Sequence, residues 1–469
     1  MKWMLITLLA CICSNVFAQS IDTKLSAAIK NLEGDAQFKH AILSMYVADT
    51  KTGKMVFEKN AEIGLAPASC QKVITSVSAF EMLGKGYTYK TELALDGPVA
   101  ANELKGNLYI IGHGDPSLGS WRWQQTRDKI VLSNILKKVK EKGIDHIAGN
   151  IIGFDANWES NNIPDGWIWE DIGNYYGAGA SGINWMENQY KIILSTEDKV
   201  GTTAKFKNIY PKLHGISFNV EVKAGARNSG DNAYVYLAPY SDKAFIRGTI
   251  PAASDSFTIS GAIPNPGYQM AYTIAEMLRG NSIIVPYSSS YNELALYKKD
   301  FPLKGVTVFY TIPSPPLDSI NYWFLKKSIN LYGEAFVKTI AYEKTKFGST
   351  DTGIAIIKDF WSKKGIEKSA LNIIDGSGLS PANRVTTNAL VTVLQYAQQR
   401  PWFASFYNAL PEINGIKMKD GYISGVRSYT GYIKSKNGAA YTFSFIVNNF
   451  DGSPGTVREK MWKLLDILK

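Results

Sequence analysis

A serine and a lysine stand three residues apart in the segment Pro67-Ala68-Ser69-Cys70-Gln71-Lys72. This segment opens an apolar-periodic helix that continues to Phe80, so both side chains lie on one helix face. A serine hydroxyl is a poor nucleophile without a base, and a lysine amine is a suitable base when burial or a nearby cation lowers its pKa. The pair predicts nucleophilic catalysis by Ser69 with Lys72 as base. The alternative is an ordinary helix N-cap, because S-x-x-K alone is common by chance.

Two further motifs follow the first in order along the chain. Ser328-Ile329-Asn330 lies in an apolar helical stretch, and Lys419-Asp420-Gly421 begins a strand near the C-terminus. Other conspicuous segments stand between the three: Gly114-Asp115-Pro116-Ser117-Leu118, Asp165-Gly166-Trp167, Tyr175-Tyr176-Gly177-Ala178, and Asp375-Gly376-Ser377-Gly378-Leu379-Ser380 before Asn383-Arg384.

The series S-x-x-K, S-x-N and K-x-G resembles the penicillin-binding proteins and serine β-lactamases. With the long segment between the first two motifs and the other segments named above, it is similar to the D-alanyl-D-alanine carboxypeptidase/endopeptidase family, the low-molecular-mass class C penicillin-binding proteins. The resemblance covers essentially the whole chain after residue 18. It implies an α+β fold: a penicillin-binding transpeptidase/β-lactamase-like domain, an antiparallel sheet flanked by helices, with a large β-rich insertion of one or two domains.

The resemblance also implies a catalytic role for five residues. Ser69 attacks the carbonyl between two D-alanines and forms an acyl-enzyme, which water then hydrolyses. Lys72 is the neutral general base, with its pKa lowered by burial and by Lys419. Ser328 passes a proton to the leaving amine, and Asn330 holds the peptide backbone of the substrate.

Substrate contacts are implied for the residues around the K-x-G motif. The backbone N–H groups of Ser69 and Tyr422 form the oxyanion hole, and Asp420, Gly421 and Tyr422 bind substrate. The implied partners are peptidoglycan stem peptides ending in D-Ala-D-Ala, with β-lactams as inhibitors that acylate the same serine. The resemblance calls for no metal and no other cofactor.

Asp420 departs from the family pattern, which has Thr or Ser there with its hydroxyl on the terminal carboxylate of the substrate. A second carboxylate nearby repels that group by about 1–4 kcal/mol, depending on the effective dielectric constant. Either Asp420 is turned away or protonated, or a cation such as Arg427 or Arg384 compensates. A regular strand places Arg427 about 23 Å away on the opposite face, and only a sharp bend at Ser424-Gly425 brings it closer.

Weaker signals point to other functions. Residues 177–182 match G-x-G-x-x-G, but no buried strand precedes them and no helix follows, which argues against dinucleotide binding. The histidines lack zinc-ligand spacing. A Ser-His-Asp triad stays open because its partners can be distant in sequence, although no G-x-S-x-G elbow supports one.

The elements that position the motifs suggest an insertion within one domain. Residues 41–57 are predicted to form a hairpin, residues 266–278 a helix, and residues 421–434 and 440–448 two strands around Asn437-Gly438. A final helix carries an apolar stripe from Val457 to Leu468. The predicted division is a transpeptidase-like domain from residues 19–87 and 264–469, interrupted by a β-rich insertion over 88–263.

The first residues resemble a secretory signal peptide over residues 1–18, because Lys2 precedes an apolar run that ends in Val16-Phe17-Ala18. A lipoprotein-like site at Cys11 is the alternative, but the better cut at Ala18 favours export to the periplasm without an anchor. No apolar stretch elsewhere approaches the ~18 residues that span a bilayer. Removal of the signal leaves Cys70 as the only cysteine, so no intramolecular disulfide forms.

The composition is that of an ordinary folded protein. The chain has 469 residues, of which 45% are hydrophobic and 20% charged, which excludes disorder, coiled coil and collagen. The formal net charge of +10 suits an anionic partner. Export and the lack of a nucleic-acid motif favour envelope polymer over nucleic acid.

The sequence therefore favours a serine-type D-Ala-D-Ala carboxypeptidase, or DD-endopeptidase, that cleaves peptidoglycan stem peptides and is inhibited by penicillin. A degenerate, non-catalytic peptidoglycan-binding homologue is the alternative, and Asp420 is the only residue that argues for it. A serine β-lactamase is a weaker alternative, because such enzymes do not need the insertion.

Overall fold

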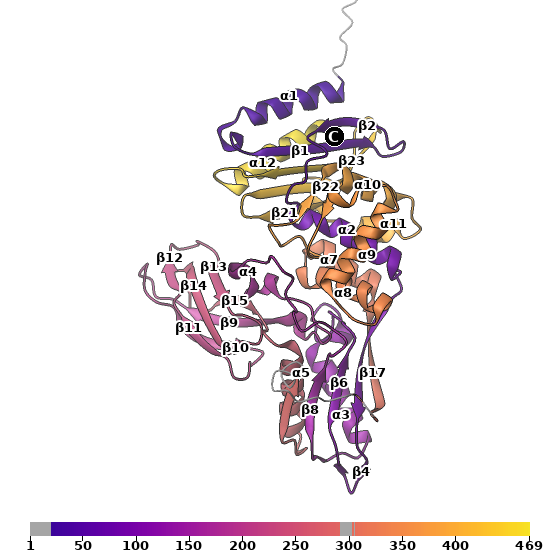
Figure 1. Ribbon diagram of the computed structural model, residues 1–469. Coiled ribbons are helices and arrows are strands. Elements are labelled where there is room, and N and C mark those ends of the chain that lie inside the picture. Colours follow the sequence, from indigo (N-terminus) through magenta and orange to yellow (C-terminus); the bar gives the residue numbers. More distant parts are fainter. Residues whose placement is uncertain (1–19, 291–302, 304) are drawn as a thin grey trace, which may run out of the picture.

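The computed structural model describes residues 20–290, 303 and 305–469 (Figure 1). The predicted signal peptide over residues 1–18 and the alternative anchor at Cys11 lie outside the described residues. Within the described part of the chain, no helix combines the length and the apolar character that a membrane crossing requires.

One antiparallel sheet joins the two ends of the chain. Its order is β2-β1-β23-β22-β21-β20, and β1 pairs with β23 along its whole length, from Ile42 opposite Asn448 to Asp49 opposite Tyr441. This sheet is therefore complete only when the last part of the chain has folded onto the first. The strands are β1 (Ile42–Asp49), β2 (Met55–Lys59), β20 (Glu412–Ile413), β21 (Ile416–Ile423), β22 (Val426–Lys434) and β23 (Ala440–Asn448).

Helices cover both faces of this sheet (Figure 1). On one face α1 (Ile21–Glu33) and α12 (Pro454–Leu465) pack on the aromatic and aliphatic side chains of β1 and β23. Helices on the other face form a second core with α2 at its centre. These helices are α2 (Lys72–Met82), α7 (Leu317–Lys327), α8 (Asn330–Thr345), α9 (Thr350–Ser362), α10 (Thr387–Gln398) and α11 (Phe403–Ala409).

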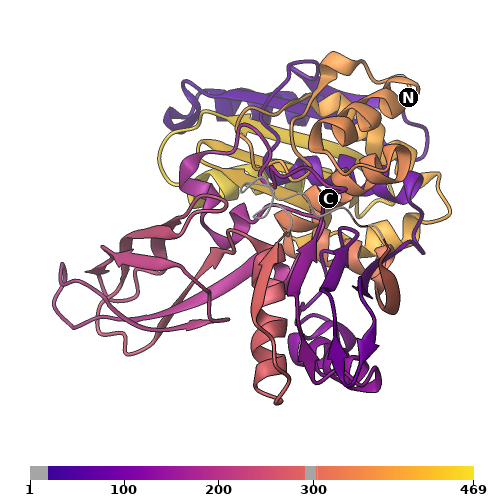
Figure 2. The ribbon, with the colours of Figure 1, turned by 60° about the horizontal axis from the view of Figure 1, so that its bottom comes forward.

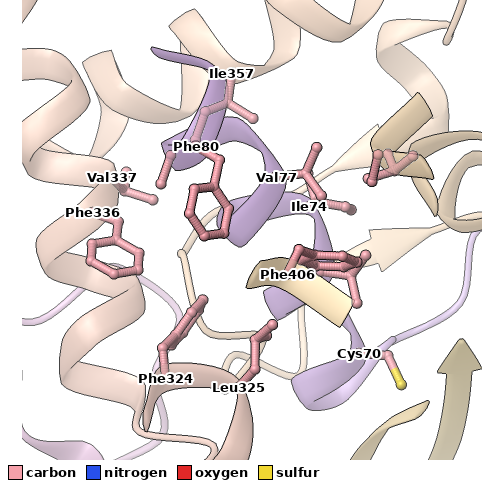
Figure 3. Packing of buried hydrophobic residues seen from close by; sticks show 14 of the residues in the cluster. Cys70, Ile74, Val77, Phe80, Phe324, Leu325, Phe336, Val337, Ile357 and Phe406 are labelled. Carbon is pink, nitrogen blue, oxygen red and sulfur yellow. The ribbon is translucent and has the colours of Figure 1, made fainter. Parts of the chain in front are cut away.

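The central helix α2 is buried on all sides. Every residue from Lys72 to Phe80 is buried, and Figure 3 shows Ile74, Val77 and Phe80 among side chains from α7, α8, α9 and α11. Burial of one such apolar side chain contributes about 1.5–3 kcal/mol. The packing therefore holds the start of α2 rigidly against the helices that carry the S-x-N motif.

The chain between α2 and α7 forms two further parts (Figure 2). The first is the sheet β16-β8-β6-β3-β17 with two helices, which together enclose a separate core. Its elements are β3 (Thr88–Leu95), β6 (Leu108–Gly112), α3 (Asp128–Glu141), β8 (Asn150–Phe154), α5 (Pro266–Arg279), β16 (Tyr287–Ser290) and β17 (Thr307–Pro316), beside the small strands β4 (Val99–Ala100), β5 (Glu103–Leu104) and β7 (His146–Ile147).

The second part is built almost entirely of strands around its own core. It has a three-stranded sheet, β10-β9-β15, and a four-stranded sheet in which β14 pairs with β11, β12 and β13. The α+β fold with a large β-rich insertion is therefore confirmed. The elements are α4 (Trp169–Ile172), β9 (Gln189–Ser195), β10 (Lys205–Tyr210), β11 (Ser217–Val220), β12 (Lys223–Gly225), β13 (Asn232–Tyr236), β14 (Lys243–Pro251) and β15 (Phe257–Ala262).

The division at residues 88 and 264 stays a prediction, and we propose moving its second boundary. β17 follows residue 264 but pairs with β3, and β16 pairs with β8. Both strands therefore complete the sheet of the inserted segment. On this basis the inserted segment runs from β3 to β17, and the first domain resumes at α7.

One predicted strand is wrong. Residues 421–434 do not form a single strand, because β21 ends at Ile423 and β22 begins at Val426. Ser424 and Gly425 make a two-residue hairpin turn, and Gly425 has a φ of 70°, a conformation that glycine adopts without strain.

Candidate active site

Ser69 lies in a single 3-10 turn, Ala68–Gln71, that leads into α2. It is not the N-cap residue of either helix, so the ordinary capping role is not what the structure shows. The preceding Ala68 is fully buried and has a φ of 45°, which costs free energy for a residue with a Cβ atom. Local strain thus accompanies the presentation of Ser69.

Lys72 is fully buried and contacts three oxygens. Its Nζ atom lies 2.8 Å from Ser69 Oγ, 2.6 Å from Asn330 Oδ1 and 2.8 Å from the Ser377 carbonyl oxygen. Burial, and after it the positive charge of Lys419, lowers the pKa of Lys72 to about 7. A neutral amine has two N–H donors and one lone pair, so it can donate to Asn330 and Ser377 while its lone pair faces the Ser69 hydroxyl.

The S-x-N motif lies at the junction of α7 and α8. Ser328 ends α7 in a left-handed conformation with a φ of 56°, and Asn330 is the first residue of α8. The Asn330 side chain binds on both sides, because Oδ1 accepts from Lys72 and Nδ2 donates to the Tyr176 carbonyl oxygen at 2.8 Å. The motif is thus joined to the nucleophile on one side and to the inserted segment on the other.

Lys419 forms an ion pair with its neighbour Asp420. Lys419 Nζ donates to Asp420 Oδ1 at 2.9 Å and to the Asp420 carbonyl oxygen at 2.6 Å. Burial raises the pKa of Asp420, but the charge and hydrogen bond of Lys419, a backbone hydrogen bond and the charge of Arg427 together outweigh burial, and the net pKa lies below its usual value. Asp420 is therefore ionised at neutral pH and turned toward the lysine of its own motif.

Arg427 is close to Asp420, contrary to its expected position on the opposite face. The turn at Ser424-Gly425 brings Arg427 directly opposite Tyr422, and its guanidinium lies 4.9 Å from the Tyr422 ring centroid. Asp420 and Tyr422 share a strand face, so Arg427 is a diagonal neighbour of Asp420. Its charge contributes to the lowered pKa of Asp420.

Arg384 points elsewhere. Its Nη1 atom donates to the carbonyl oxygens of Pro381 and Asn383 at 2.6 and 2.8 Å. Of the two arginines considered for compensation, the structure thus favours Arg427.

Gly421 allows β21 to lie directly against the nucleophile. A Cβ atom at this position would come within 2.8 Å of the Ser69 backbone nitrogen and of the Pro67 carbonyl oxygen, closer than such contacts occur. The next residue, Tyr422, has 49% of its surface exposed and lines the cavity. The oxyanion hole implied for Ser69 and Tyr422 therefore requires glycine between Asp420 and Tyr422.

Ser69 opens into a cavity of about 900 Å³ between the first domain and the inserted segment. Ser328, Asn330 and Tyr422 line it from the first domain. Asp171 lines the cavity from the inserted segment, and burial raises its pKa to about 6. The inserted segment contributes a wall that the sequence did not reveal, formed by Trp121, Arg122, Ile168, Glu170, Asp171, Tyr175, Tyr176, Gln189, Lys191, Tyr234 and Ser260.

The D-G-S-G-L-S segment holds the floor of the site through its buried aspartate. The Asp375 carboxylate accepts from Gln71 Nε2, Trp167 Nε1, Asn383 Nδ2 and the backbone N–H groups of Gly378 and Ser380, at 2.7–3.0 Å. These bonds fix the turn whose Ser377 carbonyl oxygen accepts from Lys72. The motif was visible in the sequence, but this positioning role was not.

Glu334 is a second buried carboxylate near Lys72 that sequence reasoning missed. It lies one helical turn after Asn330 and accepts from the Gly376 N–H at 2.9 Å. Burial, together with the charge of Asp375, raises its pKa to about 8.

Among the described residues, no group of three or more His, Cys, Asp or Glu side chains could hold a metal ion.

An antiparallel sheet, a serine hydrogen-bonded to a buried lysine, an S-x-N turn and a K-x-G strand together define the class of penicillin-binding serine peptidases. The profile of the D-Ala-D-Ala carboxypeptidase 3 (S13) family matches residues 25–467, and the chain belongs to this family.

Curated relatives agree with this assignment, and a solved structure has the same fold. The chain is 25% identical over 462 residues to the D-alanyl-D-alanine carboxypeptidase of Actinomadura sp. (strain R39), covering 92% of this chain and 82% of the relative. It is 23% identical to the D-alanyl-D-alanine carboxypeptidase DacB of Haemophilus influenzae, covering 87% and 85%. The crystal structure of penicillin binding protein 4 from H. influenzae superposes with a TM-score of 0.79 at 20% identity, covering 94% and 97% of the two chains.

Proposed function

We propose that this D-Ala-D-Ala carboxypeptidase acts on peptidoglycan stem peptides through an acyl-enzyme on Ser69. The observation that carries the proposal is the contact between the buried Lys72 amine and Ser69 Oγ, 2.8 Å apart, beside a cavity large enough for a peptide. The predicted signal peptide supports export to the periplasm, where peptidoglycan lies. The basic net charge suits this anionic polymer.

Acylation begins when Ser69 Oγ attacks the carbonyl carbon of the penultimate D-alanine and Lys72 Nζ takes the hydroxyl proton. Backbone N–H groups of Ser69 and Tyr422 stabilise the resulting oxyanion. The C–N bond then breaks, and Ser328 delivers its hydroxyl proton to the leaving amine of the terminal D-alanine while the proton held by Lys72 replaces it, which leaves Lys72 neutral again. In deacylation a water molecule attacks the ester carbonyl and gives a proton to the neutral Lys72 amine. The bond between the carbonyl carbon and Ser69 Oγ then breaks, the proton passes from Lys72 to Ser69 Oγ, and the shortened peptide leaves as a free acid.

The intact contacts of the catalytic side chains argue against a degenerate, non-catalytic homologue. Ser69, Lys72 and Asn330 are joined by direct hydrogen bonds, and the lowered pKa of Lys72 matches the need for a neutral base. β-Lactams should acylate Ser69 and leave slowly. Rapid turnover of a penicillin would instead favour the β-lactamase alternative.

The proposed function is tested by incubating purified protein with a synthetic stem pentapeptide and with a cross-linked peptide dimer. Mass spectrometry should show the pentapeptide losing one D-alanine if the protein is a carboxypeptidase, and the dimer splitting if it is an endopeptidase. Intact peptides in both incubations, under conditions in which the protein is folded, would contradict the proposed function.

Acylation by penicillin should accelerate as the pH rises through about 7 and then level off. Only the neutral Lys72 amine can take the proton of Ser69, and its pKa is lowered to about 7. Below that pH the neutral fraction falls about tenfold for each pH unit, and the acylation rate constant should follow it. Rate constants measured at fixed ionic strength test this. A flat profile between about pH 5 and about pH 7 would exclude Lys72 as the base.

Replacing Asp420 by threonine should increase turnover of substrates that end in a free carboxylate. The ionised Asp420 occupies Lys419 and repels a second carboxylate by about 1–4 kcal/mol, depending on the effective dielectric constant. Threonine restores a hydroxyl and frees the Lys419 ammonium group for the substrate. Steady-state kinetics of wild type and Asp420→Thr should show a lower KM for the free acid.

The matching substrate with an amidated C-terminus is the control for charge. It carries no negative charge for Asp420 to repel, so its gain should be much smaller. Equal gains for acid and amide would mean that Asp420 does not meet the terminal carboxylate.

A further inference from the structure

Glu187 is a buried residue of the inserted segment, and its carboxylate accepts hydrogen bonds from three side chains. Glu187 Oε1 accepts from Ser120 Oγ at 2.7 Å, from Arg122 Nε at 2.7 Å and from Tyr332 Oη at 2.8 Å. Glu187 Oε2 accepts from Arg122 Nη2 at 3.1 Å. We refer to Ser120, Arg122, Glu187 and Tyr332 as the Glu187 cluster.

The cluster crosses from the inserted segment to the helices that bracket the S-x-N motif. Tyr332 is the third residue of α8, which begins at Asn330. Arg122 packs its guanidinium 5.1 Å from the ring centroid of Trp323 on α7, the helix that Ser328 terminates. One carboxylate therefore holds the helix before the motif through Arg122 and the helix after it through Tyr332.

The backbone around Glu187 adopts a left-handed conformation over three consecutive residues. Met186, Glu187 and Asn188 have consecutive φ values of 53°, 54° and 51°, although none is glycine. Left-handed conformations cost free energy for residues with a Cβ atom and persist only where the surroundings over-determine them. Here the strained turn places a carboxylate with no exposed surface between the two parts of the molecule.

The position of Asn330 depends on the start of α8. Asn330 Oδ1 accepts from Lys72 at 2.6 Å, so a small shift of the first turn of α8 moves a hydrogen-bond partner of the proposed base. A misplacement of about 1 Å at a reacting group can cost about 10²-fold in rate. The single residue between Asn330 and Tyr332, Leu331, leaves little chain to absorb such a shift.

We propose that Glu187 is a positioning residue, through which the inserted segment fixes α7 and α8 so that Ser328 and Asn330 are held against Lys72 and Ser69. The inserted segment is thus part of the catalytic apparatus and not only a wall for substrate. The inference rests on acylation at Ser69, as proposed above.

The decisive variant is Tyr332→Phe, which removes one hydroxyl and leaves the ring that packs in the core. We expect the acylation rate constant for penicillin to fall about tenfold, with the dissociation constant of the noncovalent complex changed less than about twofold. Glu187→Ala, which removes all four bonds, should lower the rate further. If Glu187→Ala does not fold, the acylation rate of Tyr332→Phe alone tests the proposal.

Tyr432→Phe is the matched control. Its hydroxyl also makes one buried hydrogen bond, to the Leu394 carbonyl oxygen at 2.7 Å, but it lies on β22 outside the cluster. Thermal unfolding should show similar losses for both variants, while Tyr432→Phe keeps the wild-type rate. Equal acylation rates in the two variants would overturn the proposal. Peptide mapping of the wild-type penicillin adduct tests acylation at Ser69 separately, so failure of the proposed function is distinguished from failure of the positioning role.

Discussion

Replacing Ser69 by alanine is expected to abolish both covalent labelling by penicillin and release of D-alanine from a stem peptide. The Ser69 hydroxyl is the proposed nucleophile, and its side chain makes one hydrogen bond, to Lys72 at 2.8 Å. The core around α2 does not use it, so the variant should unfold at nearly the wild-type temperature. Gel fluorescence after incubation with a fluorescent penicillin, with circular dichroism on the same sample, measures both properties.

Ser328→Ala provides the comparison for the first prediction. Ser328 lines the same cavity but is assigned a proton transfer, so this variant should still take the label, more slowly. Labelling of Ser69→Ala at any other serine would remove Ser69 from its proposed role.

Replacing Lys72 by alanine should lower the rate of acylation by about 10²–10⁴-fold, the usual contribution of a general base. The buried amine is the group in hydrogen-bond contact with Ser69 Oγ, and its pKa near 7 suits proton transfer at neutral pH. Stopped-flow measurement of penicillin acylation gives the rate constant directly.

Lys72→Met controls for the space that alanine would leave. It keeps a long side chain among the buried residues without an amine, so its rate should be as low as that of Lys72→Ala. Nearly normal acylation in either variant would require another base, such as the histidine of a Ser-His-Asp triad.

The sequence predicted the first catalytic contact because that contact is local. Ser69 and Lys72 are three residues apart at a helix start, and this spacing alone brings their side chains together. The contacts of Asn330 with Lys72 and Tyr176 join residues 258 and 154 positions apart. Packing of separate elements determines such contacts, and no local periodicity reveals them.

The error at Ser424-Gly425 has a simple physical origin. A two-residue turn shifts the alternation by one position, because Ile423 and Val426, three residues apart, lie opposite each other and share a face. A continuous strand over residues 421–434 lacks this shift. The glycine was the available signal, because Gly425 adopts a positive φ in the turn. Missing it put Arg427 on the wrong face relative to Asp420.

The strand β17 was missed for a different reason. It contains Pro313, Pro315 and Pro316, and proline within an apolar run argues against a central strand. β17 lies at the edge of its sheet, beside β3 alone, where a missing N–H donor is tolerated. The proposed domain boundary moves for this reason.

The most direct test of Ser69 as nucleophile is peptide mapping by mass spectrometry after brief treatment of the protein with penicillin. We expect one covalent adduct, on the peptide that contains Ser69, and none on peptides that contain Ser328 or Ser377. An adduct on another serine, or none while the protein still hydrolyses the stem peptide, would contradict the account.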